Sequence, residues 1–429
     1  MIIKNGILFN TKPAIDGQKV DIKIENSIVK KIALEISPTK EEKIIDAKNL
    51  YIVPGLVDLH SHFRVPGQEY KEDFTTGSKA AAKGGITTAI AMPNTNPAID
   101  NPQILQDLYK KAEKESIIEI FFSSSMTRSR DGKTIVNIKE NKKAGAIFFT
   151  DDGSDINNPF IIFDLTKEAK KYKSLLFVHP EWHSLTKDKF FNNGELNNFF
   201  GKEGQPEEAE SLSILIFGLI AGLNKSRVHF THISTKASVE AIQFLKDKFG
   251  SLISCDTTPH HLILNDKDLI TPELDTYKKI NPPLRCEESR KAIEEALINE
   301  TIDAIATDHA PHSEEEKSNQ IEKAPFGSIG FETFLPSTYT HLVKSKKMNI
   351  LRWLNLVSTN PAKIINIDRG VLKTGKIANL VIFNQDEIVK IDKNYFLSKS
   401  KNSAFTGKIF YGKIYYTLSK GEIVYYEKI

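Results

Sequence analysis

Histidine and aspartate residues recur in this sequence directly after short apolar runs. The residues of this kind are His60, His62, Asp152, His179, His232 and Asp308. Neutral imidazoles and carboxylates, with no thiolate among them, form a donor set that suits zinc or a similar divalent ion. The residue types and their positions therefore predict a divalent metal centre.

The number of these side chains bears on the number of ions. A tetrahedral catalytic ion keeps one position open, so four histidines and two aspartates are too many for one such ion. They suit two ions that share a bridging carboxylate. Asp151 and Asp152 of "FTDDG" are both candidates for the bridge. We therefore expect Zn²⁺, one or two ions per chain, with two favoured.

Strand geometry selects among the histidines, because side chains two residues apart point to the same face of a strand. His60 and His62 are then expected to converge. In "RVHFTHIS" the spacing of three separates His229 from His232, so we expect His229 to be structural and His232 to lie nearer the site. In "IATDHAPH", Asp308 and His309 diverge, and His312 lies on a loop that could fold back over the site.

Eight apolar runs, each followed by a helical stretch, could position these residues. The runs are "GLVDLH", "TTAIAM", "IEIFFSS", "AGAIFFT", "SLLFVH", "RVHFTH", "LISCD" and "DAIAT". This pattern predicts an α/β fold, a (β/α)8 TIM barrel over residues 53–365, with its active site at the carboxyl ends of the strands. An open doubly wound sheet is the rival, but the sequence lacks the G-x-G-x-x-G turn that it predicts.

Both ends of the chain show alternating apolar and polar positions with Gly and Pro turns. This period of two is typical of short antiparallel strands. We expect residues 1–52 and 366–429 to form one small composite β domain. The first strand is expected to turn at Asn5-Gly6.

Composition limits the classes of partner. The net charge is only +3, and the lysines are scattered, so we expect no nucleic-acid partner. The longest apolar stretch, residues 213–223, is too short for a membrane span and is expected to be a buried helix. The N-terminus lacks the pattern of a secretion signal, and Cys255 and Cys286 have no C-x-x-C spacing, which together favour the cytoplasm.

A series of motifs points to one family. In chain order they are "DLHSHFRVPG", "KGGITTAIAMPNT", "FTDDG", "HISTKASV", "TPHHL", "NPPLR", "ATDHAPHSEEEK" and "APFGSIGFET". The series resembles class I dihydroorotases of the amidohydrolase superfamily over almost the whole chain. The resemblance implies a zinc-dependent interconversion of N-carbamoyl-aspartate and dihydroorotate in pyrimidine synthesis.

The resemblance also implies a role for each matched residue. His60 and His62 would bind the more buried zinc together with Asp308, and the second ion would be bound by His179 and His232. Asp152, rather than Asp151, would bridge the ions, and Asp308 would act as the catalytic proton shuttle. The implied substrate-binding residues are His62, Arg64, Asn94, Asn281, His312, Phe326 and Gly327. Of these, Arg64, Asn94 and His312 would hold the substrate carboxylate, which suits the planar donor fork of arginine.

Two alternatives remain. Hydantoinases and allantoinases resemble this architecture, but they typically bridge their metals through a carboxylated lysine, and "AIFFTDDG" has no lysine there. A non-catalytic homologue that assists aspartate transcarbamoylase would lack metal ligands, and none is missing. The sequence leaves open a homodimer and a complex with aspartate transcarbamoylase. The segment "HPEWH" departs from the family pattern, so the surroundings of His179 are not predicted.

Overall fold

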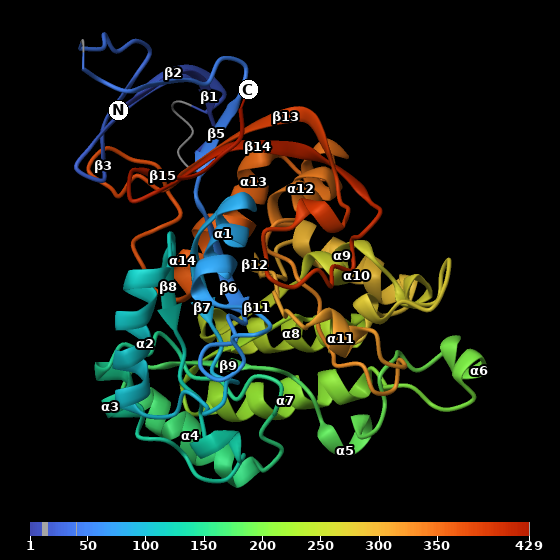
Figure 1. Cartoon of the computed structure of the whole chain (residues 1–429). Coiled ribbons are helices and arrows are strands. Elements are labelled where there is room, and N and C mark those ends of the chain that lie inside the picture. Colours follow the sequence, from blue (N-terminus) through green and yellow to red (C-terminus); the bar gives the residue numbers. More distant parts are fainter. Residues whose placement is uncertain (11–15, 40, 429) are drawn as a thin grey trace.

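Strands from both ends of the chain form one eight-stranded sheet, at the top of Figure 1. The computed structural model describes residues 1–10, 16–39 and 41–428. The sheet has the order β15-β14-β13-β5-β1-β2-β3, and β4 pairs with β1. Its strands are β1 (Ile2–Leu8), β2 (Gln18–Glu25), β3 (Ile28–Ala33), β4 (Ile44–Asp46), β5 (Tyr51–Pro54), β13 (Leu380–Lys390), β14 (Ile409–Ser419) and β15 (Glu422–Tyr426).

The predicted turn at Asn5-Gly6 is wrong, because β1 continues through both residues. Asn5 has a φ of +64°, and the pairing of β1 with β2 shifts register between Ile3 and Gly6. The Asn5 N–H donates to Asp21 Oδ1 at 2.9 Å, and its side-chain amide donates to Asp46 Oδ1 at 2.9 Å. These bonds hold an irregularity inside the strand, although Asn-Gly is the residue pair typical of a hairpin turn.

Seven further strands form two parallel ladders, β6-β7-β8 and β12-β11-β10-β9. They are β6 (Leu56–Ser61), β7 (Ile86–Ala91), β8 (Glu119–Phe122), β9 (Leu175–Val178), β10 (Arg227–Phe230), β11 (Ile253–Thr257) and β12 (Ala304–Ile305). Each lies, to within one residue at its ends, inside one of the eight apolar runs predicted to be strands, and almost every residue in them is buried. The fold is therefore of the mixed α/β class.

The remaining run, "AGAIFFT", joins the two ladders without forming a strand of its own. Phe149 makes parallel bridges to Ser124, just after β8, and to Leu176 of β9. A third parallel bridge, between Ser61 and His309, connects β6 to the segment that follows β12. The succession of parallel pairs therefore returns to β6, where it began.

Helices follow most of these strands. The helices are α1 (Phe74–Lys83), α2 (Pro102–Glu115), α3 (Ile138–Lys143), α4 (Pro159–Lys171), α5 (His183–Thr186), α6 (Leu196–Phe200), α7 (Glu208–Leu223), α8 (Lys236–Phe249), α9 (Pro259–Ile263), α10 (Glu287–Ile298), α11 (Glu314–Lys317), α12 (Phe334–Thr338), α13 (Ile350–Leu354) and α14 (Asn360–Ile364). The apolar stretch 213–223 lies in α7, which packs between α4 and α8.

Short 3-10 and π helices complete the connections. They are η2 (Arg128–Arg130), η3 (Gly250–Leu252), η4 (Asp266–Leu269), η5 (Thr276–Lys278), η6 (Tyr339–Lys344), η7 (Asn355–Thr359) and η8 (Lys393–Tyr395). The two π segments, η6 and η7, lie in the largest apolar core, where they contribute Tyr339, Leu342, Leu356 and Val357.

Two stacked phenylalanine rings lie in an apolar cluster that is lined mainly by aliphatic side chains. The rings of Phe148 and Phe177 stack with their centroids 3.7 Å apart, and the Phe177 ring lies 4.3 Å from that of His229. His229 is fully buried, and its two ring nitrogens bond to Ser254 Oγ at 2.8 Å and to Asp256 Oδ2 at 2.9 Å. His229 thus has structural partners, as its spacing from His232 predicts.

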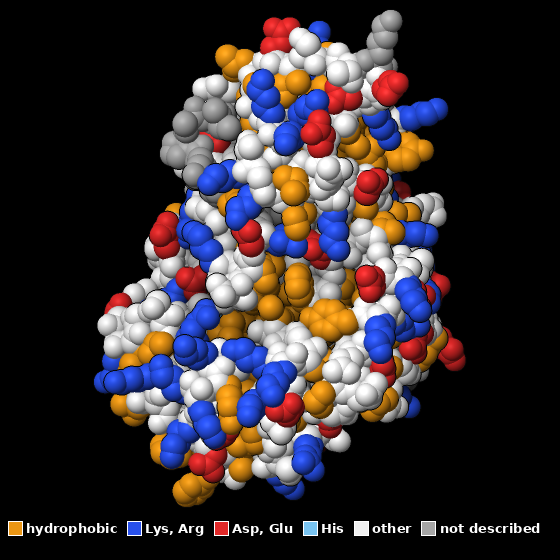
Figure 2. Space-filling view, turned by 90° about the vertical axis from the view of Figure 1, so that its left-hand side faces the viewer, with side chains coloured by type: hydrophobic (Ala, Val, Ile, Leu, Met, Phe, Trp, Pro, Cys, Tyr) orange, Lys and Arg blue, Asp and Glu red, His pale blue; other side chains and the backbone are white. Residues whose placement is uncertain are grey.

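Charged side chains are mixed over the surface. Figure 2 shows basic side chains interspersed with acidic ones over most of one face, in agreement with the small net charge. No helix in the described part of the chain combines the length and the apolar content needed to cross a bilayer.

Candidate active site

Every predicted site residue except His60 lines one cavity of about 360 Å³. These residues come from segments up to 265 positions apart, and they are His62, Arg64, Asn94, Asp152, His179, His232, Asn281, Asp308, His312, Phe326 and Gly327. His60 is only 1% exposed, and it contacts Asp152 and Asp308 of the lining. The fold thus collects all the predicted residues in one place.

His60, His62 and Asp308 form the first of two groups whose donor atoms could hold one ion. Asp308 Oδ1 lies 3.1 Å from His62 Nε2 and 3.5 Å from His60 Nε2. The other ring nitrogen of His62, Nδ1, lies 2.9 Å from Asn94 Oδ1. This contact to the amide oxygen fixes the ring so that Nε2 faces Asp308.

His60 of β6 and His62, which directly follows β6, converge although the strand is irregular. The register between β6 and β7 shifts between Asp58 and Ser61, so strict alternation is interrupted at this point. The ring centroids of His60 and His62 nevertheless lie 5.2 Å apart. The predicted convergence is therefore present in the structure.

His60, Asp152 and His232 form the second group. Asp152 Oδ1 lies 3.2 Å from His60 Nε2 and 3.6 Å from His179 Nδ1. His179 is not in the group itself, but its Nδ1 lies 2.9 Å from His232 Nε2. Asp152 is thus the carboxylate that reaches the histidines of both predicted ion sites, because its Oδ2 also lies 3.7 Å from His62 Nε2.

The two acids of "FTDDG" point to different places. Asp151 accepts hydrogen bonds from the backbone N–H groups of Met126 and Thr127 at 2.8 and 3.1 Å, and from the Thr127 hydroxyl. Asp152 instead faces the histidines and accepts from the Asn94 amide at 3.0 Å. Burial raises the pKa of Asp151 to about 6, although the hydrogen bonds from Thr127 and Met126 and the charge of Arg130 lower it.

The electrostatics of the cluster fit a cation. Burial would lower the pKa of His60, but Asp152 and Asp308 raise it to about 9. Burial and the neighbouring His179 and His60 hold the pKa of His232 well below its usual value. The cluster thus attracts positive charge without being able to place a proton on every ring.

Buried ring nitrogens give a second indication. Both nitrogens of His60 and Nδ1 of His232 are buried and have no hydrogen-bond partner among the described residues. Buried polar atoms without partners cost free energy, and a bound divalent ion would satisfy such nitrogens. The donor set and its geometry therefore fit the metal that the resemblance implies.

Arg64 and His312 form one wall of the cavity. Arg64 Nη2 lies 3.2 Å from His312 Nε2, and Arg64 Nε donates to the Pro311 carbonyl at 3.1 Å. Sequence reasoning missed Lys71, a buried lysine whose Nζ lies 3.3 Å from His312 Nδ1 and 2.9 Å from Glu316 Oε1. Its position in a polar segment after the motif gives no sign that it is buried.

Sequence reasoning also missed Glu181 of "HPEWH". Its Oε2 lies 2.9 Å from His179 Nε2 and accepts from the Asn281 amide at 2.8 Å. Burial would raise the pKa of Glu181, but His179 and His183 lower it well below its usual value. Glu181 therefore orients His179 so that Nδ1 faces Asp152. The spacing of two residues between His179 and Glu181, which places both side chains on one face of an extended chain, is the signal that could have identified Glu181.

Three site residues have left-handed backbone conformations. Arg64, His232 and Asp308 have φ values of +62°, +39° and +47°. Such conformations are uncommon for residues other than glycine, and they cost free energy that the surrounding structure must offset. They aim these side chains into the cavity from segments that have already left their strands.

Comparison with known proteins finds relatives that match almost the whole chain. A family model described as dihydro-orotase-like matches residues 50–238. The dihydroorotase of Bacillus licheniformis is 38% identical over 428 residues, covering 99% of this chain and 98% of the relative. The dihydroorotase of Clostridioides difficile is 38% identical over 425 residues, covering 99% of each chain.

Solved structures of related enzymes share the fold. The L-hydantoinase (dihydropyrimidinase) of Arthrobacter aurescens has a TM-score of 0.87 at 26% identity, covering 98% of this chain and 95% of that chain. The D-hydantoinase (dihydropyrimidinase) of a Thermus species has a TM-score of 0.82 at 22% identity, with 98% and 94% covered. Full-length identity is higher with the dihydroorotases than with these hydantoinases, and the chain therefore belongs to the dihydroorotase family.

Proposed function

We propose that this enzyme is a dihydroorotase, which interconverts N-carbamoyl-L-aspartate and (S)-dihydroorotate with release or uptake of water in pyrimidine (UMP) synthesis. The observation that carries the proposal is the position of Arg64 and His312 beside the histidine–carboxylate cluster in one cavity. A dihydroorotate ring has a carboxylate that needs such a cationic partner. The full-length similarity to dihydroorotases supports the same function.

We further propose that the parallel strands form a (β/α)8 barrel, which spans residues 53–365. The bridges through Phe149 and between Ser61 and His309 support closure, because they link the two ladders at both edges. The sheet built from both ends supports a composite β domain of residues 1–52 and 366–429.

The residues that would hold zinc are those of the two groups, together with His179. They are His60, His62 and Asp308 for one ion, and His179 and His232 for a second, with Asp152 between them. A divalent ion bound there supplies a Lewis acid that polarises a carbonyl oxygen and lowers the pKa of water. Two ions are favoured, because one ion cannot accept every donor.

The chain's own residues perform the remaining tasks. Arg64, Asn94 and His312 hold the substrate carboxylate. Asn281, Phe326 and Gly327 line the opposite wall of the cavity, where the substrate ring would contact them. The Asp308 carboxylate, buried against His60 and His62, takes a proton from the attacking water and delivers it to the leaving ring nitrogen. Ring closure uses the same proton transfer in reverse.

Hydantoinase or allantoinase activity is the alternative, since the solved relatives carry the first of these names. Neither hydantoin nor allantoin has a carboxylate for Arg64 to bind. No lysine lines the described cavity, and an aspartate, Asp152, stands between the histidines. Both observations favour dihydroorotate as the substrate.

One experiment tests the proposal. The purified enzyme is assayed with dihydroorotate, carbamoyl aspartate, hydantoin and allantoin, and its zinc content is measured in the same sample. We expect turnover of the first two substrates and bound zinc. Zinc together with turnover of only hydantoin or allantoin would contradict the proposal.

The Arg64→Lys variant is expected to raise KM for dihydroorotate about 10-fold to 100-fold with a smaller change in kcat. Lysine retains the charge but loses the planar donor fork, which is worth about 1.5–3 kcal/mol in a charged hydrogen bond. The carboxylate is bound in both the ground state and the transition state, so KM carries the effect. Steady-state kinetics measure it, and an unchanged KM would rule out the carboxylate contact.

The Glu181→Gln variant is expected to bind its second metal ion about 10-fold more weakly, because a neutral amide orients His179 less strongly than a carboxylate. Metal titration of the purified protein measures the effect. His183→Ala is the control, since it removes a 3.4 Å contact to Glu181 but leaves the bond between Glu181 and His179. Equal metal affinity in both variants would contradict the orienting role.

A cytoplasmic location follows from the proposed metabolic role. A homodimer and a complex with aspartate transcarbamoylase are both compatible with a small-molecule enzyme of this family. Gel filtration of the purified chain, alone and with the transcarbamoylase, measures both.

A further inference from the structure

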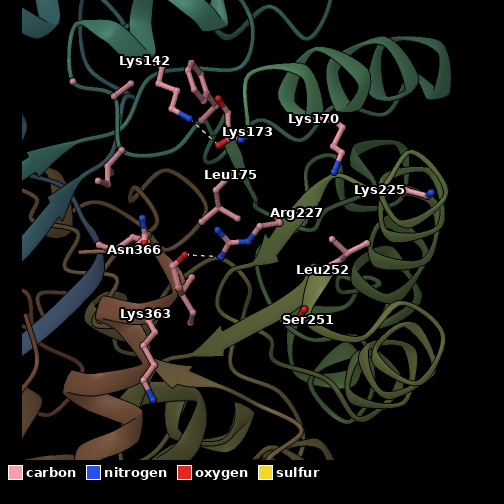
Figure 3. Close-up of a pocket in the computed structure, with 17 residues that line it drawn as sticks. Lys142, Lys170, Lys173, Leu175, Lys225, Arg227, Ser251, Leu252, Lys363 and Asn366 are labelled. Atoms are coloured by element: carbon pink, nitrogen blue, oxygen red, sulfur yellow. Dashed lines mark hydrogen bonds between the residues drawn. The ribbon is translucent and has the colours of Figure 1, made fainter. Parts of the chain in front are cut away.

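A second cavity, of about 960 Å³, lies at the opposite ends of the strands that carry the candidate active site (Figure 3). Leu175 and Arg227, which line it, are the first residues of β9 and β10. His179 and His232 follow the other ends of the same two strands. The cavity is therefore separate from the metal cluster, and the proposed function makes no use of it.

Six cationic side chains line this cavity, and no Asp or Glu is among the described residues of its lining. The cations are Lys142, Lys170, Lys173, Lys225, Arg227 and Lys363. They come from four separate parts of the sequence, so no run of basic residues predicts the cluster. Because no carboxylate neutralises them, they create a positive potential in the hollow.

The neighbouring lysines of the same helices are paired. Lys143 of α3 lies 3.2 Å from Glu140, and Lys171 of α4 lies 3.4 Å from Glu168. Among the described residues, none of the six cavity cations forms such an ion pair. Carboxylates are thus available on these helices, but they pair with the lysines outside the cavity.

Backbone carbonyls hold two of the cations in place. Lys142 Nζ donates to the carbonyls of Tyr172 and Lys173 at 2.7 and 2.8 Å, and Arg227 Nη2 donates to the Ile364 carbonyl at 2.7 Å (Figure 3). Burial lowers the pKa of both groups, and the charge of Lys173 lowers that of Lys142 further. These bonds order the side chains without neutralising them, and Arg227 keeps further N–H donors.

Helix dipoles explain part of the arrangement. Lys142, Lys170 and Lys363 lie in the last turns of α3, α4 and α14, where a cation gains about 0.3–1 kcal/mol. This term does not explain Arg227, which begins a strand, or Lys225, which follows a helix end. It also does not explain why all six lack carboxylate partners.

The size and lining of the cavity indicate the class of ligand. Apolar side chains, including Ile147, Leu175 and Leu252, lie between the cations. Its volume is within the range of about 300–1,000 Å³ that is usual for small-molecule sites. Ammonium and guanidinium groups are the side chains that bind phosphate oxygens. We propose that this cavity binds a small molecule that carries a chain of phosphates, either inorganic polyphosphate or a nucleoside triphosphate.

Calorimetric titration of the zinc-loaded enzyme with inorganic tripolyphosphate and with ATP, at about 0.15 M salt, tests the proposal. We expect saturable binding of at least one of them and much weaker binding of inorganic phosphate. The Lys170→Ala, Lys173→Ala double variant should weaken that binding at least 10-fold. The matched control, Lys143→Ala with Lys171→Ala, removes the same charge from the same region and should bind as the unaltered enzyme does.

The outcomes separate the sources of the ligand. Tighter binding of ATP than of tripolyphosphate supports a nucleotide, whose base would contact the apolar lining, whereas equal binding supports an inorganic polyphosphate. The proposal is overturned if no triphosphate binds saturably, if both double variants weaken binding equally, or if polyglutamate binds while the triphosphates do not. Turnover of dihydroorotate and the melting temperature of both variants should remain unchanged, which shows that each is folded.

Discussion

The Asp308→Asn variant is expected to lower kcat for dihydroorotate about 10²-fold to 10⁴-fold, the range for loss of a general acid–base group. Asparagine has nearly the same shape but cannot take up a proton. In the structure the carboxylate is buried, and burial would raise its pKa, but His60 and His62 hold that pKa well below the usual value. The group is thus ionised and ready to accept a proton from water.

Metal content must be measured in the same Asp308→Asn sample, because Asp308 Oδ1 is also a donor of the first group. The left-handed backbone at this position suits asparagine, so the variant should keep the fold and its melting temperature. A variant that retains its zinc and turns over dihydroorotate at the original rate would rule out proton transfer by Asp308.

The second large effect is expected at Asp152. The Asp152→Asn variant should lose at least one ion per chain and about 10³-fold or more in kcat, because the carboxylate touches His60, His62 and His179. Burial would raise the pKa of Asp152, but His60 and His179 keep it ionised. Removal of the charge leaves the buried histidines without the carboxylate that they share, which zinc analysis and kinetics both detect.

The adjacent Asp151 gives a matched control. Asp151→Asn should keep its zinc and its turnover, but should lower the free energy of unfolding by about 1–3 kcal/mol, since it weakens hydrogen bonds to Met126 and Thr127. Chemical denaturation measures the loss. If Asp151→Asn loses zinc while Asp152→Asn retains it, the two carboxylates have been assigned the wrong way round.

Much of the site could be predicted from local rules. The parity of His60 and His62 predicts their convergence, and both reach Asp308. The same rule separates His232 from His229, which pairs with Ser254 and Asp256. These predictions succeed because strands impose one short geometric period, and the two register shifts between β6 and β7 do not change which residues are near the cavity.

Other features depend on contacts that no local rule describes. A turn and the N–H groups of residues 126 and 127 determine which of Asp151 and Asp152 faces the histidines, and only the folded chain brings these N–H groups near. Lys71 belongs to the site because it contacts His312, which lies on a distant segment. Glu181 belongs to it because it contacts His179, and both of these residues lie beyond the end of β9.

The fold, like the site, could be predicted from local sequence only in part. The apolar runs predict the parallel strands, but "AGAIFFT" joins the ladders only through single bridges at Phe149. Asn5-Gly6 has the composition of a turn, yet tertiary bonds to Asp21 and Asp46 keep it within β1. At both places long-range pairing overrides the local preference.

The sheet made from both ends of the chain determines when the protein can finish folding during synthesis. Val53 of β5 pairs with Val381 of β13, and β1 lies in the interior of the same sheet. During synthesis on the ribosome, the edge of β5 that pairs with β13 therefore stays unpaired until nearly the whole polypeptide has been made. The amino-terminal strands are the first to be synthesised and among the last to be covered, so a chaperone that shields exposed strand edges would act on this segment.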